Sequence, residues 1–311
     1  MSDNVQFEVS EGSGIVRLDR PRAINALSPQ MLQEVDAQLR AWIDEDAIER
    51  VELRGEGERG FCSGADVRAI RELVSTQPEE AVAFFEHEYE LDALIATYPK
   101  PVTALIHGIS MGGGLGLALH AAEVVSAPDL VLAMPETTIG LFPDVGIDWQ
   151  LSRAPGQTGA YLAMTGTSID AGSALWAGMV DRVAGDLPEG PCQLETDAVW
   201  VDECFAGDDA TAIVARLEEH SDGRARGAGA LLRTKSPLSV CVALEAVRRA
   251  ESMSDVGEVL AQDLVLARNF VADSDFCEGV RAQLVDKDRN PVWSIARIED
   301  VSRDRVEQMF R

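Results

Sequence analysis

The start of the chain first shows alternating apolar and polar residues and then apolar residues at helical spacing. Residues 5–9 and 14–18 both alternate, and Gly12-Ser13-Gly14 between them is typical of a turn, so we expect a β-hairpin. Ser28-Pro29 then places an N-cap residue before a proline suited to the first helical turn. The apolar residues that follow lie on one face of the expected helix: Met31, Leu32, Val35, Leu39 and Trp42.

Short apolar runs alternate with helical stretches in the next part of the chain. Residues 50–54 and 102–106 have the length of strands, and two more short strands are expected on either side of residues 127–129. Residues 79–97 have the pattern of an amphipathic helix, and another helix is expected over residues 117–122. Strands that alternate with helices predict an α/β protein.

The pattern changes near residue 203, after which the strand signals stop. Ser236-Pro237 repeats the combination of cap and proline that starts a helix, and most of the remaining chain has helical spacing. No linker rich in Pro, Gly and Ser separates the two parts. We therefore expect a core over residues 1–202 and a mainly helical C-terminal portion over residues 203–311, packed on that core.

The composition limits the kinds of partner. Acidic residues outnumber basic ones 53 to 27, for a formal net charge of -26, whereas nucleic-acid binding depends on Lys and Arg. The five cysteines and four histidines show no metal-ligand spacing, which argues against zinc. The N-terminus lacks a signal-peptide pattern, and no apolar run reaches the ~18 residues of a membrane span. We expect a cytoplasmic protein with no metal, no membrane and no nucleic-acid partner.

Two glycine-rich segments each lie between a strand pattern and a helix pattern. They are Ser63-Gly64-Ala65-Asp66 and Gly112-Gly113-Gly114. Amide groups at a helix N-terminus lack acceptors in their own helix and can bind an anion, and glycines let a ligand approach the main chain. Neither segment matches a dinucleotide or P-loop pattern. The pair suits an oxyanion hole for an acyl group, and two purely structural turns are the alternative.

Two carboxylates lie in the otherwise apolar segment 134–146. Gly140 and Pro143 interrupt any helix between Glu136 and Asp144, so loop geometry sets their relation. Apolar neighbours desolvate a carboxylate and favour its neutral form, which tunes it for proton transfer. A Glu136 that caps a helix or pairs with an arginine is the structural alternative.

These segments resemble the crotonase (enoyl-CoA hydratase/isomerase) superfamily. The resemblance extends over about residues 5–200 and is carried by residues 25–27, 60–67 and 100–116. It implies a spiral of ββα units and an acyl-CoA substrate, with an oxyanion held by the backbone amides of Ala65 and Gly113. It also implies a homo-oligomer, and no cofactor beyond the coenzyme A that is part of the substrate.

A narrower resemblance points to the 3-hydroxyisobutyryl-CoA hydrolase branch. Hydratases of the superfamily carry a catalytic Glu three residues after the middle glycine, where this chain has Gly116, and a second Glu that this chain keeps as Glu136. The segments similar to the hydrolase branch are residues 84–89, 134–146 and 278–291. The resemblance implies that Glu136 and Asp144 are catalytic and that Glu88 lies at the acyl pocket.

The function implied is hydrolysis of a short branched acyl-CoA thioester, 3-hydroxyisobutyryl-CoA, in valine catabolism. Glu136 would act as nucleophile or as general base, Asp144 would hold the substrate hydroxyl or the water, and Arg22 is a candidate for the coenzyme A phosphates. An enoyl-CoA hydratase or isomerase and a non-catalytic binding protein of the same fold stay open. Ile147-Asp148-Trp149 departs from the branch, which has glycines and an aromatic residue there, and this departure adjoins the acyl pocket.

Overall fold

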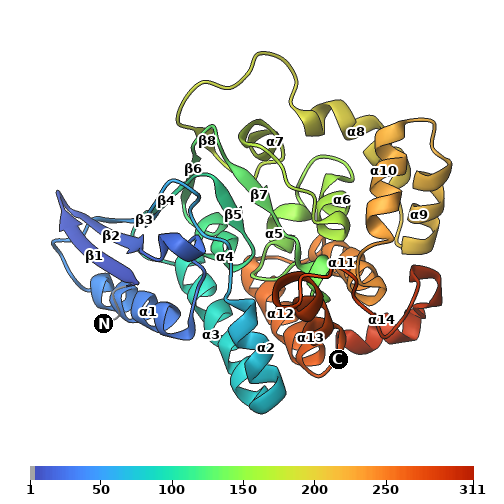
Figure 1. Cartoon of the computed structure of the whole chain (residues 1–311). Coiled ribbons are helices and arrows are strands. Elements are labelled where there is room, and N and C mark those ends of the chain that lie inside the picture. The colour runs from blue at the N-terminus through green and yellow to red at the C-terminus, as the bar shows by residue number, and fades with distance from the viewer. Residues whose placement is uncertain (1–3) are drawn as a thin grey trace. The chain divides into compact units, whose positions relative to one another are not determined.

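The computed structural model of the protein describes residues 4–311 and divides into two compact units, each assembled from three stretches of chain (Figure 1). The first unit comprises the described part of Met1–Asp66 together with Glu86–Ala133 and Ser168–Cys192. The second comprises Val67–Phe85, Met134–Thr167 and Gln193–Arg311. Helix α8 (Gln193–Cys204) runs across residue 203. The division of the chain expected at that point stays a prediction.

A mainly parallel sheet with the strand order β1-β2-β3-β4-β6-β8 forms the centre of the first unit (Figure 1). Strands β1 and β2 pair antiparallel, as the hairpin pattern predicted, and the other neighbours are parallel. The α/β class predicted from the sequence is therefore confirmed. The strands are β1 (Val5–Ser10), β2 (Ser13–Leu18), β3 (Arg50–Gly55), β4 (Val102–Ile106), β5 (Ile109–Met111), β6 (Glu123–Ser126), β7 (Val131–Ala133) and β8 (Arg182–Val183).

A second ladder in the first unit joins the segments that follow these strands. Strand β5 pairs parallel with β7, and single bridges join Leu27 to Ala65 and Cys62 to Ser110. Strands β4 and β6 of the first sheet thus each continue into a strand of the second ladder. The other helices of this unit are η1 (Pro21–Ala23), α1 (Pro29–Ile43), the later part of α3 (Pro78–Ala96), α4 (Gly113–Leu119) and α7 (Ala171–Trp176).

Local sequence explains where helix α1 begins and which face it buries. The Ser28 hydroxyl accepts a hydrogen bond from the Met31 amide at 3.3 Å, and Pro29 occupies the first helical position. The residues predicted to form the apolar face are the ones that the helix buries: Met31, Leu32, Val35, Leu39 and Trp42. Both parts of the prediction for this helix are confirmed.

Helix α4 differs from the prediction, because it begins at Gly113 rather than Leu117 and ends at Leu119. The low helix propensity of consecutive glycines argued for a turn at this point. Packing overrides that preference, since a Cβ on Gly114 would lie only 2.6 Å from the Cβ of Cys62. The glycines therefore form the first turn of a fully buried helix, with Gly112 as its N-cap.

The second unit is mainly helical. Its helix α6 is buried along its whole length and contacts α11, which begins after the Ser236 cap as predicted. Residues 203–311 contain no strand, which agrees with the prediction for this part of the chain. The unit contains α2 (Val67–Thr76), the start of α3, η2 (Glu136–Ile139), α5 (Asp148–Leu151), α6 (Thr158–Thr165), α8, α9 (Ala210–Glu219), α10 (Gly223–Leu232), α11 (Pro237–Ala250), α12 (Val256–Val271), α13 (Asp275–Val280), η3 (Arg281–Val285), η4 (Ile298–Asp300) and α14 (Arg303–Met309).

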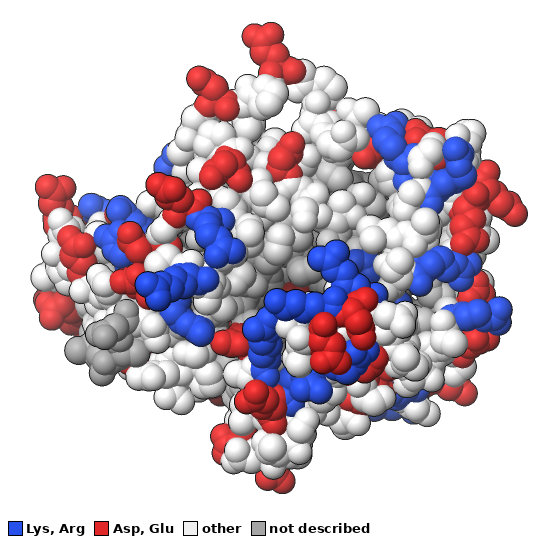
Figure 2. Space-filling view, viewed as in Figure 1, with Lys and Arg blue, Asp and Glu red and all other residues white. Residues whose placement is uncertain are grey.

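Charged side chains cover much of the surface. Figure 2 shows Asp and Glu distributed over one face with Lys and Arg scattered among them. Many arginines form ion pairs, as Arg233 does with Glu218 at 2.8 Å and with Glu299 at 2.6 Å. Exposed ion pairs contribute only about 0–1 kcal/mol each, so they add little to the stability of the fold. No helix within residues 4–311 is both long enough and apolar enough to cross a membrane.

Candidate functional site

Ala65 and Gly113, the two predicted oxyanion donors, lie side by side in the first unit. A Cβ on Gly113 would stand 3.5 Å from the Ala65 amide nitrogen, and a Cβ on Gly64 would stand 3.2 Å from the Gly113 amide nitrogen. Leu27 holds this segment in place, since its amide donates to the Gly64 carbonyl and its carbonyl accepts from the Asp66 amide, both at 2.9 Å. The structure thus brings together two segments that are far apart in sequence.

Within residues 4–311, no backbone or side-chain acceptor takes a hydrogen bond from the N–H of Ala65 or Gly113. Gly113 is the first residue of α4, and the leading N–H groups of a helix have no acceptor within it. Two neighbouring donors of this kind can hold one negatively charged oxygen. Their use by a substrate stays a prediction.

Glu88 lies against Gly113 in the same unit. Its side chain is 1% exposed, and its Oε1 occupies the space that a Cβ on Gly113 would need. Cys62 is buried nearby: burial, followed by the charge of Glu88, raises the pKa of its thiol to about 12. The protonated Sγ donates to the Asn25 carbonyl at 3.2 Å, as expected of a packing residue. Whether Glu88 contacts an acyl group stays a prediction.

Asn25 fixes the early turn that the sequence resemblance includes. Its backbone φ is 52°, in the left-handed region that asparagine tolerates better than most residues. The side-chain amide donates to the carbonyls of Phe61 at 2.8 Å and Glu56 at 3.0 Å, and its oxygen accepts from the Arg20 amide at 2.8 Å. The role of Asn25 here is to hold the first glycine-rich segment. Arg22 nearby is exposed, and its contact with phosphates stays a prediction.

Glu136 belongs to the second unit, where it is the first residue of η2. Its side chain is 7% exposed, and its Oε2 is buried without a hydrogen-bond partner among residues 4–311. Burial first, and then the charge of Asp144, raise the pKa of Glu136 well above its usual range, while the Lys235 ammonium acts in the opposite direction. No arginine in the described part of the chain pairs with Glu136. The arginine-paired alternative from the sequence is therefore wrong.

Asp144 lies close enough to Glu136 to act on its ionisation, so the structure brings the two predicted carboxylates together. Asp144 is 4% exposed. The chain between them reverses at Gly140, whose φ is 71° and whose Cβ, if present, would collide with the Asp275 carbonyl. A second turn at Gly146 has φ 73°. Gly140 thus permits the loop that sequence reasoning expected between the two carboxylates, and Gly146 permits the turn that follows Asp144.

Lys235 lies close enough to Glu136 to act on its ionisation, and sequence reasoning missed it. It is 6% exposed, and its Nζ donates to the Thr138 hydroxyl at 2.6 Å. Burial lowers the pKa of this lysine to about 8, and the charge of Glu136 opposes that change. Lys235 also lines a cavity of about 390 Å³ in the second unit. The chain has only three lysines, and this rarity was the one signal in the sequence that could have singled it out.

Asp148 and Asp263 are two further buried acids near Asp144. Each is 1% exposed. Burial and the charge of Asp144 raise the pKa of Asp148, and burial, Asp148 and Asp144 raise that of Asp263. Asp148 belongs to the segment that departs from the hydrolase branch. Asp263 was missed, although an acid within the apolar stripe of a helix is a recognisable signal.

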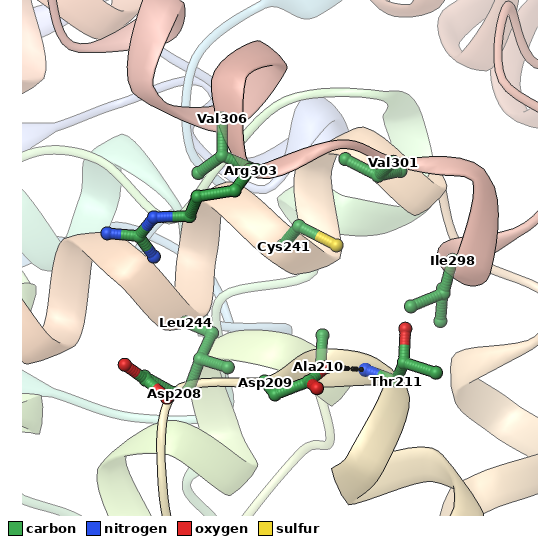
Figure 3. Close-up of a pocket in the computed structure, with 10 residues that line it drawn as sticks. All are labelled: Asp208, Asp209, Ala210, Thr211, Cys241, Leu244, Ile298, Val301, Arg303 and Val306. Carbon is green, nitrogen blue, oxygen red and sulfur yellow. Dashed lines mark hydrogen bonds between the residues drawn. The ribbon is translucent and has the colours of Figure 1, made fainter.

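Another cavity of the second unit, of about 340 Å³, contains none of the predicted catalytic residues (Figure 3). Two of its polar side chains have structural partners: Asp209 caps α9 by accepting from the Thr211 amide at 2.9 Å, and Arg303 donates to Glu245 at 2.7 Å. Burial raises the pKa of the Cys241 thiol there to about 12. Within residues 4–311 no group of three or more His, Cys, Asp or Glu side chains is arranged to hold a metal ion.

Comparison with known proteins places this chain in a family. The family model described as Enoyl-CoA hydratase/isomerase matches residues 13–187 and 184–310. The chain belongs to the enoyl-CoA hydratase/isomerase family. This confirms the superfamily resemblance that was based on the glycine-rich segments.

Curated relatives within this family carry the hydrolase name. The chain is 33% identical to the mitochondrial 3-hydroxyisobutyryl-CoA hydrolase of Gallus gallus, with 99% of this chain and 89% of the relative covered. It is 31% identical to 3-hydroxyisobutyryl-CoA hydrolase 1 of Arabidopsis thaliana, with 100% and 92% covered. The narrower resemblance to this branch of the enoyl-CoA hydratase/isomerase family is thereby confirmed.

Solved structures within the family carry other names. A carnitinyl-CoA dehydratase from Mycobacterium thermoresistibile has a TM-score of 0.95 and 34% identity, with 100% of this chain and 97% of the other covered. An enoyl-CoA hydratase from Rhodobacter sphaeroides 2.4.1 has the same TM-score and identity, with 99% and 97% covered. Both confirm the fold. Because the names divide between hydrolases and hydratases, the chemistry must be argued from the residues of this chain.

Proposed function

We propose that this protein is an acyl-CoA thioester hydrolase that converts 3-hydroxyisobutyryl-CoA into 3-hydroxyisobutyrate and coenzyme A. The observation that carries the proposal is that α4, where hydratases of the family carry a catalytic Glu, contains only Gly, Leu and Ala. Water addition to an enoyl group would lack one of its two usual carboxylates. Hydrolysis of a thioester needs oxyanion donors and one buried carboxylate, and the names of the curated relatives support it.

The proposed oxyanion donors are the amides of Ala65 and Gly113. Attack on the thioester carbon moves negative charge onto its oxygen, and rigid N–H groups stabilise that charge without reorganising. One such donor commonly contributes about 3–4 kcal/mol to transition-state stabilisation. The support for this role is that the two amides lie next to each other and that no acceptor among residues 4–311 takes a hydrogen bond from either of them.

Glu136 would attack or activate water. As a nucleophile its carboxylate oxygen bonds to the thioester carbon, the C–S bond breaks, coenzyme A leaves as a thiolate, and water cleaves the resulting mixed anhydride. As a general base it removes a proton from water, the hydroxide formed attacks the same carbon, and the C–S bond then breaks so that coenzyme A leaves as a thiolate that takes up a proton. Both routes need an ionised Glu136, and the Lys235 ammonium supports ionisation against the burial that opposes it. Hydroxylamine distinguishes the two routes where it forms a hydroxamate on Glu136 itself, detected by peptide mass spectrometry, because the free thioester also gives an acyl hydroxamate.

The remaining roles follow from this chemistry. Asp144 would hold the substrate hydroxyl or the attacking water, and Glu88 would contact the acyl group. The chemistry needs no cofactor beyond the coenzyme A of the substrate, because every step is an acyl or proton transfer. We also expect a cytoplasmic location and a homo-oligomer, and light scattering of the purified protein tests the oligomeric state.

Enoyl-CoA hydration is the second candidate, and the observation that favours it is the naming of the two solved structures at 34% identity. It would require a carboxylate other than one on α4 to assist Glu136. Hydrolysis releases a free thiol from 3-hydroxyisobutyryl-CoA, whereas hydration removes the enoyl absorbance of crotonyl-CoA and releases no thiol. Following both signals on both thioesters separates the two functions.

The decisive variant is Glu136→Gln, which keeps the shape of the side chain and removes its charge. We expect thiol release from 3-hydroxyisobutyryl-CoA to fall by about 10³-fold or more, because neither route works without an ionised carboxylate. Glu245→Gln is the matched control, since Glu245 is also a buried glutamate but pairs with Arg249 at 2.7 Å and Arg303 at 2.7 Å. If the wild-type protein removes the enoyl absorbance of crotonyl-CoA and releases no free thiol, hydrolysis is rejected in favour of hydration. If neither thiol release nor loss of enoyl absorbance is detected, a non-catalytic binding protein is favoured.

A further inference from the structure

The main chain directly after Asp144 has a strained conformation. Val145 has a φ of 56°, in the left-handed region, and is 1% exposed. A β-branched residue rarely adopts this conformation, because its side chain crowds the neighbouring carbonyl. Such conformations persist where the surrounding structure holds them, and they are concentrated at active sites. Some other part of the second unit must therefore hold the turn on which Asp144 stands.

Asp263 of α12 holds one side of that turn. Its Oδ2 accepts a hydrogen bond from the Gly146 amide at 2.7 Å, in a buried bond between residues 117 apart in sequence. Gly146 directly follows Val145 and also has a left-handed φ. Burial and the neighbouring acids raise the pKa of Asp263, which favours its neutral form. A neutral acid still accepts through its carbonyl oxygen, as an asparagine side chain would.

Phe270 of the same helix holds the other side. Its ring stacks on that of Phe142, with centroids 5.3 Å apart and planes 26° apart, and both side chains are fully buried. Phe142 lies two residues before Asp144, and Gly146 lies two residues after it. Asp263 and Phe270 are seven residues apart on α12, so they project from the same face about two turns apart. Helix α12 therefore contacts the chain on both sides of Asp144.

We propose that α12 clamps the turn that carries Asp144, and that Asp263 is a positioning residue that acts on Asp144 through the Gly146 amide. The proposal rests on the catalytic part proposed for Asp144 in thioester hydrolysis. Catalytic groups need placement within about 0.5 Å, and a displacement of about 1 Å can lower the rate about 100-fold. The clamp keeps the Asp144 carboxylate in place against the tendency of Val145 to leave its strained conformation.

The test uses the full chain and thiol release from 3-hydroxyisobutyryl-CoA, with kcat and KM measured separately. Asp263→Leu removes the acceptor and is expected to lower kcat about 100-fold. Asp263→Asn keeps an acceptor oxygen and is expected to retain kcat within about threefold. Val145→Gly removes the strain, so adding it to Asp263→Leu is expected to restore kcat at least about tenfold.

The matched control is Asn269→Leu. Asn269 lies on the same helix and donates to the Met309 carbonyl at 2.8 Å, away from the Asp144 turn. The kcat of the Asn269→Leu variant is expected to equal that of the wild type. The proposal is overturned if Asp263→Asn is as impaired as Asp263→Leu, since the charge rather than the hydrogen bond would then matter. It is also overturned if Val145→Gly restores nothing, or if Asn269→Leu loses as much kcat as Asp263→Leu.

Thermal unfolding separates failure of the clamp from failure of the proposed function. If the wild-type protein releases no thiol, the proposed hydrolase function is wrong, and the clamp is then tested by the Tm values alone. Val145→Gly loses the same buried side chain in both backgrounds, but only in the wild type does it also relieve strain that the clamp maintains. Its change in Tm is therefore expected to be more favourable in the wild type than in the Asp263→Leu background, where the turn has already relaxed. Equal changes in the two backgrounds would show that Asp263 and Val145 are independent, and the clamp would be rejected.

Discussion

Replacing Lys235 by methionine is expected to stabilise the fold and at the same time to remove most of the thioesterase activity. Lys235 is 6% exposed, and burial lowers the pKa of its ammonium from 10.5 to about 8. At neutral pH the group is protonated in both the folded and the unfolded chain, but the folded chain disfavours the charge. Methionine keeps a long unbranched side chain without a charge, so this penalty disappears.

The magnitude follows from the lowered pKa. The difference between 10.5 and about 8 corresponds to about 3 kcal/mol of unfavourable free energy in the folded state. Loss of the 2.6 Å hydrogen bond to Thr138 offsets about 1 kcal/mol of the gain. We therefore expect the free energy of unfolding to rise by about 2 kcal/mol at neutral pH.

The pH dependence of stability gives an independent check. Between about pH 8 and pH 10.5 the unfolded chain keeps the proton on Lys235 while the folded chain has lost it. Stability rises with pH wherever the unfolded state binds more protons, so the wild type should become more stable across this window. Lys235→Met should lack this contribution. Activity should fall in the variant, because the ammonium of Lys235 lowers the raised pKa of Glu136 and so favours its ionised form.

The assay combines urea unfolding at neutral pH and at about pH 10 with thiol release from 3-hydroxyisobutyryl-CoA. The matched control is Lys100→Met, because the Lys100 ammonium donates to the Glu45 carbonyl at 2.9 Å in the first unit. This control should lose stability and keep its activity. If Lys235→Met unfolds at lower urea than the wild type at neutral pH, Lys235 contributes to stability and the reasoning fails.

Three further predictions concern glycine packing, acid–base chemistry and a buried thiol. Gly114→Ala should lower the free energy of unfolding by about 1–3 kcal/mol, because the new Cβ would lie 2.6 Å from the Cβ of Cys62. The control is Gly227→Ala on α10, where a Cβ would meet no atom within 4 Å and no stability should be lost. Burial and Asp144 raise the pKa of Glu136, so kcat/KM should still increase with pH at values above the usual titration range of a carboxylate. A kcat/KM that is already constant at acid pH would contradict this. Cys62, with a pKa of about 12, should resist iodoacetamide until the protein unfolds, which peptide mass spectrometry detects.

Local sequence was enough for the elements whose signals lie within a few residues. The Ser28 and Ser236 caps, each followed by proline, mark where α1 and α11 begin, and helical spacing identifies the buried face of α1. These predictions succeeded because capping and amphipathic spacing are decided by neighbours along the chain. The family resemblance also came from short ordered segments. The pairing of Ala65 with Gly113 was then expected from the resemblance, and the structure brings the two residues together.

Interactions between distant residues decided the rest. Helix α4 begins earlier than glycine propensity predicts, because close packing against Cys62 makes glycine necessary there. Burial and Asp144 raise the pKa of Glu136, and the charge of Lys235, which lies about a hundred residues further along the chain, opposes that rise. The bond from Gly146 to Asp263 spans 117 residues. By itself the sequence determined the family and the fold class, and it predicted which two carboxylates are catalytic. Only the tertiary structure decided their ionisation and placement, because both depend on burial and on charges that folding brings together.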